Sequence, residues 1–149
     1  MQLVPIEQSG EVHLEGVDLP DISAGVIQAA CALYARKGFA PPWILYLAVE
    51  DDAVVGTCGF AAPAAQGKAE IAYFTFPVEE GRGVATRMAQ ALLTLSADEA
   101  RRIDTRYIAH TLPAEGASTA ILRKLGFALQ GPVQHPEDGV VWQWQRAAA

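Results

Sequence analysis

The chain reads Ala72-Tyr73-Phe74-Thr75-Phe76 and then, after a short link, Glu80-Gly81-Arg82-Gly83-Val84-Ala85-Thr86. The first run is rich in aromatic residues and is closed by Pro77, a composition that favours a β-strand. After Gly83, apolar residues recur at helical intervals, at Val84, Met88, Leu92 and Leu95. The sequence therefore predicts a strand that leads through a glycine-rich turn into the first turn of a helix.

This glycine-rich turn has the properties of an anion site. The first backbone N–H groups of a helix have no intrahelical partner, and the helix dipole makes that end positive. Gly81 and Gly83 carry no Cβ atoms, so a phosphate or pyrophosphate can approach the backbone. Arg82 and Arg87 could add charge-assisted contacts. The alternative is a tight turn whose glycines serve geometry alone.

The place of the turn in the chain argues against two common nucleotide-binding folds. A dinucleotide-binding fold carries its glycine-rich turn after the first strand, whereas here two hairpin-like apolar runs come before the strand that ends at Phe76. A Walker motif needs Gly-Lys-Ser/Thr, which this turn lacks.

The rest of the chain predicts a mixed α+β fold. Helices are expected from Asp18 or Asp21 to Lys37, after Gly83, and over 118–124, with Gly126 at the C-cap. Their order among the strands predicts a mixed, mostly antiparallel sheet of six to seven strands with helices on both faces. The helical crossover after Phe76 makes the 70–76 and 107–111 strands parallel. The expected strands are 3–6, 43–49, 54–60, 70–76, 107–111, 128–130 and 140–145.

Length and composition restrict the protein class. The 149 residues predict a single domain over 1–149, and a net charge of −6 disfavours nucleic acid as a partner. No apolar run is long enough for a membrane span, and the N-terminus lacks the blocks of a signal peptide, so the expected compartment is the cytoplasm. Cys31 and Cys58 give neither a disulfide framework nor metal-ligand spacing, so no metal is expected.

Two motifs together resemble a known family. The segment 69–77 followed by 81–86 resembles the central signature of the GNAT superfamily of N-acetyltransferases. The segment 113–118 followed by 122–127 is similar to that family's second signature. Within the superfamily the chain is most similar to the ribosomal-protein alanine N-acetyltransferase branch. The resemblance covers nearly the whole chain and implies a single-domain GNAT-like fold with a splayed pair of parallel strands, here those of Phe74 and Ile108.

The resemblance also implies a cofactor and a reaction. Acetyl-CoA would lie between the splayed strands, and a primary amine, either a small molecule or a peptide N-terminus, would attack the thioester directly in a ternary complex. A backbone N–H of the Phe74 strand would polarise the thioester carbonyl. The protein would be a monomer or a homodimer. The pantetheine arm would pair with backbone near Phe74, Thr75 and Phe76, and the pyrophosphate with Gly81, Arg82, Gly83, Val84, Ala85 and Thr86.

Candidate catalytic residues follow from the same resemblance. Glu70 corresponds to an acidic residue that acts as general base through water, although a solvated carboxylate at a strand start is the alternative reading. Ser118 matches a serine near the cofactor sulfur and could assist thiolate departure, or it could cap the following helix. His110 is an alternative base, but a lone histidine near a strand end is more often structural. His135 falls in a loop-like segment and has no assigned role.

Two departures from the family pattern keep a second function open. Glu80 stands where the family has Gln or Arg, and Glu115 stands where the branch has an Asn that bonds the pantetheine arm. A carboxylate beside a pyrophosphate is electrostatically unfavourable. These residues favour a non-catalytic acyl-CoA-binding or regulatory module of the same fold, while the intact glycine turn and Glu70 favour an enzyme. An enzyme that uses a different acyl-CoA is a third alternative.

Overall fold

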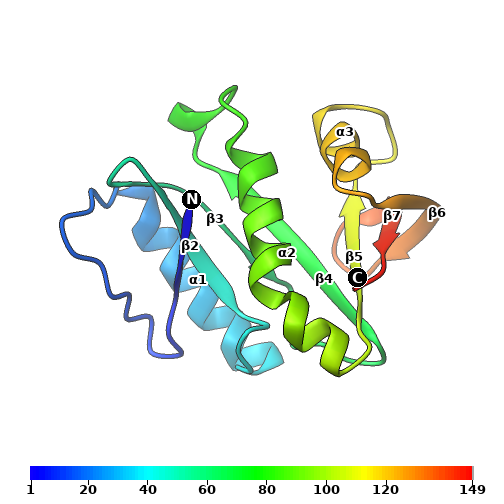
Figure 1. Cartoon of the computed structure of the whole chain (residues 1–149), viewed down its shortest axis with the longest axis horizontal. Helices are drawn as coiled ribbons and strands as arrows, with labels where there is room; N and C mark the ends of the chain where they lie inside the picture. The colour runs from blue at the N-terminus through cyan, green and yellow to red at the C-terminus, as the bar shows by residue number, and fades with distance from the viewer. Residues whose placement is uncertain (149) are drawn as a thin grey trace.

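The computed structural model describes residues 1–148, which form one seven-stranded sheet with three helices (Figure 1). The strand order across the sheet is β1-β2-β3-β4-β5-β7-β6. The helices are α1 (Ile22–Lys37), α2 (Val84–Arg102) and α3 (Ala117–Lys124), and a 3-10 turn covers Pro77–Glu79. The strands are β1 (Gln2–Pro5), β2 (Leu45–Glu50), β3 (Ala53–Phe60), β4 (Lys68–Thr75), β5 (Arg106–Thr111), β6 (Ala128–His135) and β7 (Gly139–Arg146).

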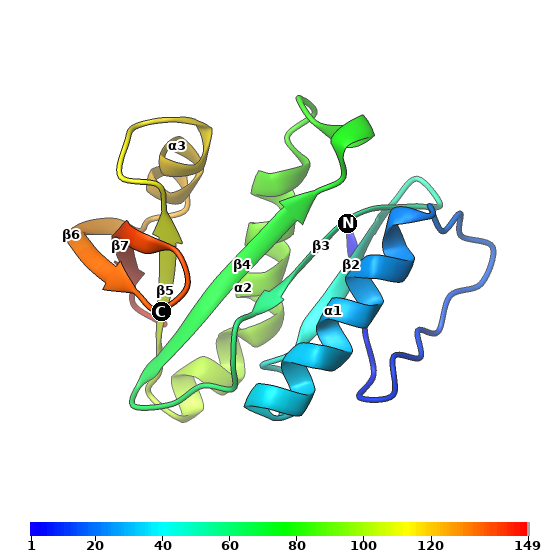
Figure 2. The same cartoon turned by 180° about the vertical axis from the view of Figure 1, so that it is seen from behind.

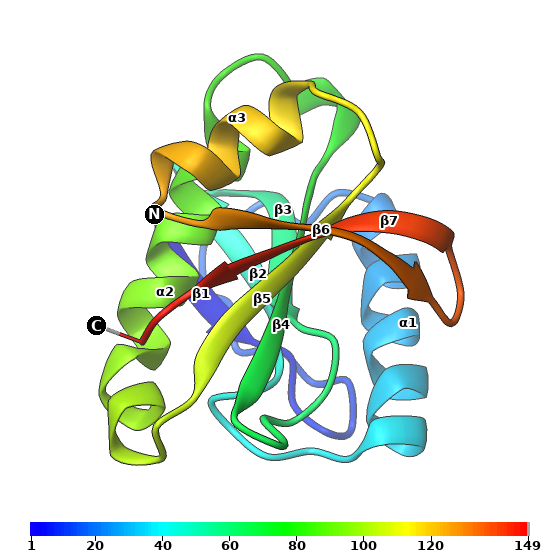
Figure 3. The same cartoon turned by 90° about the vertical axis from the view of Figure 1, so that its right-hand side faces the viewer.

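The sheet has the mixed, mostly antiparallel character that the sequence predicted. Among the described strands β4 and β5 are the parallel pair, and every other neighbouring pair is antiparallel. Figure 3 shows α1 and α2 on opposite faces of the sheet. The crossover from β4 to β5 runs through α2, as the connection of two parallel strands requires. None of the helices within residues 1–148 has the length and apolar character of a membrane span.

The parallel pair holds together only at its beginning. β4 and β5 pair at Lys68 with Arg106, Ala69 with Tyr107, and Glu70 with Ile108. From Ile71 to Thr75, β4 stays paired with β3, while β5 stays paired with β7. The two strands therefore diverge toward their C-terminal ends, which Figures 1 and 2 show as a V-shaped opening. This confirms the splayed pair that the resemblance implied.

Close packing fixes the start of α2 at the end of β4. The buried face of α2 includes Val84, Met88 and Leu92. Opposite this face lies Gly56 of β3, where a Cβ atom would stand 2.9 Å from the Met88 sulfur and 2.6 Å from the Phe74 carbonyl oxygen. Only glycine fits this contact, and the contact lets the helix lie close against the sheet. The glycine-rich turn is consequently held beside the wide end of the V.

The structure departs from the predicted elements at a few boundaries. β6 extends to His135 rather than stopping at Gln130, because an edge strand tolerates Gly131 in a register shift and Pro132 without losing a ladder bond. Asp21 occupies the N-cap of α1 but makes no side-chain cap bond. The last helix begins at Ala117, one residue earlier than expected.

Candidate functional site

Two glycines in the left-handed region shape the turn before α2. Gly81 has φ 79° and Gly83 has φ 74°, a conformation that residues with a Cβ atom rarely adopt. A Cβ atom at Gly83 would also lie 3.1 Å from Nη1 of Arg87. The glycines are therefore required by backbone geometry, and the same geometry leaves the turn open to solvent.

The turn presents a row of backbone donors. The first backbone bond into α2 runs from Arg87 N–H to the Gly83 carbonyl at 3.2 Å, and Glu80 N–H donates to the Pro77 carbonyl at 3.3 Å. Within residues 1–148, none of the backbone hydrogen bonds of turns, loops and helix caps has an N–H group of residues 81–86 as its donor. Unpaired N–H groups at a helix start are the physical basis of an anion site.

A groove of about 540 Å³ connects this turn with β4 and α3. One wall is the end of β4, the other is the start of α3, and the helix start closes one end. Most of the residues that the sequence singled out for the cofactor line it. These are Phe74, Thr75, Gly81, Gly83, Val84, Ala85 and Thr86, together with Glu80 and with Ser118 from α3.

Three other candidates lie differently. The Phe76 side chain is buried and its N–H donates to the Val55 carbonyl at 3.0 Å, so neither group faces the groove. Arg82 is exposed and lies 3.4 Å from Glu79. Arg87 forms two bonds to the Glu50 carboxylate, at 2.7 and 2.9 Å, and a third to the Arg82 carbonyl at 2.8 Å. Arg87 thus ties the turn to β2 rather than offering its charge to a ligand.

Backbone direction in β4 identifies the groups that face the V. Phe76 N–H bonds the Val55 carbonyl, and the Glu70 carbonyl accepts from Ala61 N–H, so these even-numbered residues turn their backbone toward β3. Successive residues of a strand direct their backbone groups to opposite sides. Tyr73 and Thr75 therefore direct theirs toward the opening between β4 and β5. Their backbone, rather than that of Phe74 or Phe76, is free for a ligand.

Ser118 lies exposed on the groove side of α3 and does not cap the helix. The N-cap position belongs to Gly116, whose N–H donates to Oγ1 of Thr119 at 2.9 Å. Thr119 is the buried hydroxyl that organises this end, and its Oγ1 also donates to Glu115 at 2.8 Å. The capping role considered for Ser118 is thus filled by its neighbour, and the Ser118 hydroxyl is left facing the groove.

Glu115 is held outside the groove. Its carboxylate accepts two bonds from Arg123, at 2.6 and 2.8 Å, in addition to the one from Thr119. The hydrogen bonds from Arg123, and to a lesser extent the one from Thr119, lower the pKa of Glu115 to about 2. Glu115 therefore braces α3 as a fixed anion. Its replacement of the family's Asn leaves the groove itself unobstructed, whereas Glu80 does line the groove.

Glu70 lies in a second cavity, of about 490 Å³, between the end of α1 and the β6–β7 hairpin. Its strand neighbours Ala69 and Ile71 are buried, whereas Glu70 projects from the other face of β4 and is partly exposed. Glu70 and Ser118 are therefore not brought together in one cavity. Other polar residues that line the Glu70 cavity are Arg36, Lys37, His110, Gln134, His135, Glu137, Asp138 and Gln143.

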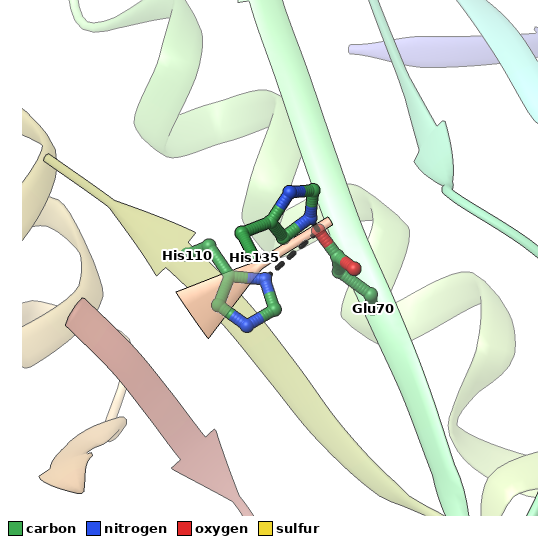
Figure 4. Close-up of side chains that lie close together, drawn as sticks. All are labelled: Glu70, His110 and His135. Carbon is green, nitrogen blue, oxygen red and sulfur yellow. Dashed lines mark ion pairs between the residues drawn. The ribbon is translucent and has the colours of Figure 1, made fainter. Parts of the chain in front are cut away.

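Two histidines stand beside the Glu70 carboxylate (Figure 4). His110 Nδ1 lies 3.0 Å from Glu70 Oε2, and His135 Nε2 lies 4.0 Å from the same oxygen. The other nitrogen of His110 is 3.1 Å from Oε1 of Gln143 on β7. The sequence suggested His110 only as an alternative base and gave His135 no role. Spacing along the chain carries no signal for this cluster, because strand pairing alone brings its members together.

Comparisons with known proteins agree with this geometry. The sequence matches the family described as acetyltransferase (GNAT) domain over residues 18–128. No curated protein matches the chain. Among solved structures, RimL, a ribosomal L7/L12 α-N-protein acetyltransferase in complex with coenzyme A, is 25% identical, with a TM-score of 0.64 over 85% of this chain and 72% of its own.

Two further solved structures share the fold at lower identity. An acetyltransferase from Salmonella typhimurium that modifies the N-terminal serine of ribosomal protein L7/L12 is 24% identical, with a TM-score of 0.62 over 85% of this chain and 74% of its own. The ribosomal-protein-S5-alanine acetyltransferase from Vibrio fischeri is 14% identical, with a TM-score of 0.60 over 70% of this chain and 61% of its own. With a family match that spans most of its length, a V between two parallel strands and a donor-lined helix start at the mouth, this chain belongs to the GNAT acetyltransferase family.

Proposed function

We propose that the chain transfers the acetyl group of acetyl-CoA to a primary amine by direct attack within a ternary complex. The observation that carries the proposal is the groove that joins the open edge of β4 to the unpaired N–H groups before α2. Such a groove matches a ligand with an anionic pyrophosphate at one end and a hydrogen-bonding arm at the other. The coenzyme A bound to the RimL structure supports this choice of cofactor.

The cofactor lies with its pyrophosphate on the N–H groups of 81–86 and its pantetheine arm along Tyr73 and Thr75. The thioester then points toward the closed end of the V, where Glu70 pairs with Ile108. Glu80 is exposed at the rim of the groove, and the site works through main-chain donors rather than through this side chain. A V-facing N–H of β4 polarises the thioester carbonyl, and such fixed donors are usually the largest catalytic contribution.

The amine enters from the Glu70 cavity, on the other side of the V from the cofactor groove. Glu70 accepts the proton that the ammonium must lose, directly or through one water, and the free amine attacks the thioester carbon. The nitrogen that has attacked then gives up its extra proton, the C–S bond breaks, and the leaving thiolate takes up that proton with help from the Ser118 hydroxyl at the groove. By analogy with the Salmonella relative that modifies an N-terminal serine, we propose a peptide α-amine as the acceptor.

Thermal unfolding with coenzyme A and acetyl-CoA tests the cofactor half of this proposal. A ligand at about one hundred times its Kd stabilises the folded state by about 2.7 kcal/mol, and each kcal/mol raises Tm by about 2–4 °C in a domain of this size. We therefore expect a Tm increase of about 5–10 °C. Thiol release from acetyl-CoA with a panel of amines and peptides tests transfer. No stabilisation by either cofactor would overturn the proposal.

A non-catalytic acyl-CoA-binding module is the second candidate, favoured by the Glu80 carboxylate at the groove. It shares the cofactor site but makes Glu70 an ordinary strand carboxylate. The same experiment separates the two functions, because a binding module is stabilised by acetyl-CoA yet releases no thiol with any amine. Release with one acceptor and not with its N-acetylated form identifies the enzyme.

A further inference from the structure

A carboxylate and two imidazole rings lie close together in the Glu70 cavity (Figure 4). Glu70, His110 and His135 come from β4, β5 and β6 respectively. Each offers one ligand atom, and these three atoms lie within 4.8 Å of one another. Figure 4 shows both rings turned toward the same carboxylate. Two histidines and a carboxylate with an open side are a common ligand set for a divalent transition metal.

A buried nitrogen of His110 lacks a hydrogen-bond partner beside Glu70. Its Nδ1 is buried and has no hydrogen-bond partner within residues 1–148, although Glu70 Oε2 is only 3.0 Å away. Its Nε2 lies 3.1 Å from Oε1 of Gln143, a contact that fixes the orientation of the ring. In this orientation Nδ1 faces the Glu70 carboxylate, and both atoms are ordinary metal-ligand atoms. A metal ion between them would give the buried Nδ1 a partner.

The spacing of the ligand atoms suits a metal ion. Zinc bonds to nitrogen and oxygen ligands of about 2.0–2.1 Å place neighbouring ligands of a tetrahedral ion about 3.3–3.4 Å apart. The separations from Glu70 Oε2, 3.0 Å to His110 and 4.0 Å to His135, lie on either side of this value. All three ligand atoms lie within 4.8 Å of one another, so the side chains must move closer together to bind one tetrahedral ion. Its fourth position opens into the 490 Å³ cavity.

A second carboxylate is placed to support the metal-bound form of His135. Asp138 Oδ2 lies 3.4 Å from His135 Nδ1, the nitrogen that faces away from Glu70. A metal-bound histidine usually donates its other N–H to a carboxylate or an amide. In the absence of metal, Nδ1 of His135 accepts N–H bonds from Glu137 and Asp138, at 3.2 and 3.3 Å. A metal ion on Nε2 would require the ring proton to be on Nδ1, which would replace these two N–H bonds by one bond to Asp138 Oδ2.

We propose that Glu70, His110 and His135 form a binding site for one zinc-class divalent ion. The ion satisfies the buried Nδ1 of His110 and draws β4, β5 and the β6–β7 hairpin together. It also occupies the Glu70 lone pairs that would otherwise accept a proton, so metal binding and base function at Glu70 exclude each other. Metal binding at this site does not require that the protein transfer acetyl groups.

Calorimetry of the metal-stripped full chain with Zn²⁺ tests the proposal without any substrate. We expect saturable binding of one ion per chain, and a visible Co²⁺ absorption band of the intensity that tetrahedral coordination gives. H135N should weaken Zn²⁺ binding by at least about tenfold, and D138N by a smaller but measurable factor. H13N serves as the matched control, because His13 is exposed and outside the cluster. It should bind Zn²⁺ as the wild type does.

The proposal is overturned if the wild type shows no saturable Zn²⁺ binding, because the three side chains then form no metal site. It is equally overturned if H135N and H110N bind as tightly as H13N, since the ion then binds elsewhere. E70Q keeps the shape of the side chain and provides a third variant should a histidine replacement unfold the chain. Circular dichroism and thermal unfolding of each variant establish that it is folded. Failure of acetyl transfer alters none of these outcomes.

Discussion

The proposed pyrophosphate site depends on the backbone conformation of Gly83. Its φ of 74° is unfavourable for any residue with a Cβ atom, and that atom would meet Arg87 at 3.1 Å. We expect G83V to reorient the N–H groups of the turn and to remove at least about 90% of the Tm increase that acetyl-CoA gives. G16V is the matched control, with a φ of 66° and no atom near its Cβ. A G83V chain that binds acetyl-CoA normally would place the pyrophosphate elsewhere.

Glu70 gives a prediction that separates chemistry from binding. The carboxylate lines the 490 Å³ cavity, where we propose that the amine enters, and not the groove proposed for the cofactor. We expect E70Q to lower kcat/KM for the amine by about 10²–10⁴, the usual contribution of a general base, while the Kd for acetyl-CoA stays within about twofold. E99Q is the control, because Glu99 pairs with Arg102 on the exposed side of α2. Equal loss of coenzyme binding in E70Q would contradict a role limited to proton transfer.

The sequence predicts the glycine-rich turn better than it predicts the direction of individual groups around it. The glycine turn is visible because glycine and an apolar helix pattern report backbone conformation locally. The direction of the Phe76 N–H group was not predictable in the same way, since it depends on a hydrogen bond to Val55 in another strand. His135 is missed entirely, because only the pairing of β6 with β7 and of β7 with β5 carries it toward Glu70. Contacts between strands that are far apart in the sequence cannot be inferred from the spacing of residues along the chain.

At the level of elements, Glu50 on β2 and Arg87 on α2 fasten the glycine turn to the sheet. Arg87 bonds Glu50 through two nitrogens and the Arg82 carbonyl through a third contact. This pairing lowers the pKa of Glu50 below its ordinary 4.5. The pair therefore stabilises the folded state above pH 4.5, and the contribution is lost as the pH falls through the lowered pKa.

The corresponding prediction concerns E50Q. We expect it to reduce the free energy of unfolding at pH 7 by about 0.5–1 kcal/mol, since the arginine is half-exposed and water screens the pair. The difference from wild type should shrink progressively below pH 4.5. Urea unfolding at pH 7 and at two acidic values measures both. A deficit that is constant with pH would mean that packing, rather than the ion pair, holds the turn.

The order of helices and strands could be predicted because each has its own spacing of apolar residues and ends at residues that interrupt regular structure, such as glycine or proline. Val84, Met88 and Leu92 repeat at helical spacing and form the buried face of α2. β6 shows the limit of this reasoning, since Gly131 and Pro132 look like a strand end. They are tolerated because β6 is an edge strand, which within residues 1–148 pairs with β7 alone. Whether a strand is central or at an edge is a property of the assembled sheet.

Across the whole molecule, the V divides one sheet into two parts. β1 to β4 form one part and β5 to β7 the other, and within the sheet they pair directly only at Lys68–Glu70 with Arg106–Ile108. The two walls of the groove come from different parts, since β4 and the α2 turn stand on one side and α3 on the other. A ligand in the groove therefore bridges segments that the sheet alone couples weakly at this end.

This bridging predicts a specific pattern of hydrogen exchange. Acetyl-CoA should slow exchange of the N–H groups at 81–86 and of β4, because it accepts their hydrogen bonds, and also at the start of α3, because it holds that helix against the groove. β1 and β2 lie at the far edge of the sheet and should exchange at an unchanged local rate. Mass spectrometry of peptides from free and acetyl-CoA-bound chain measures all of these segments together. Protection of 81–86 without α3 would mean that the ligand occupies only one wall, and that the V does not act as a clamp.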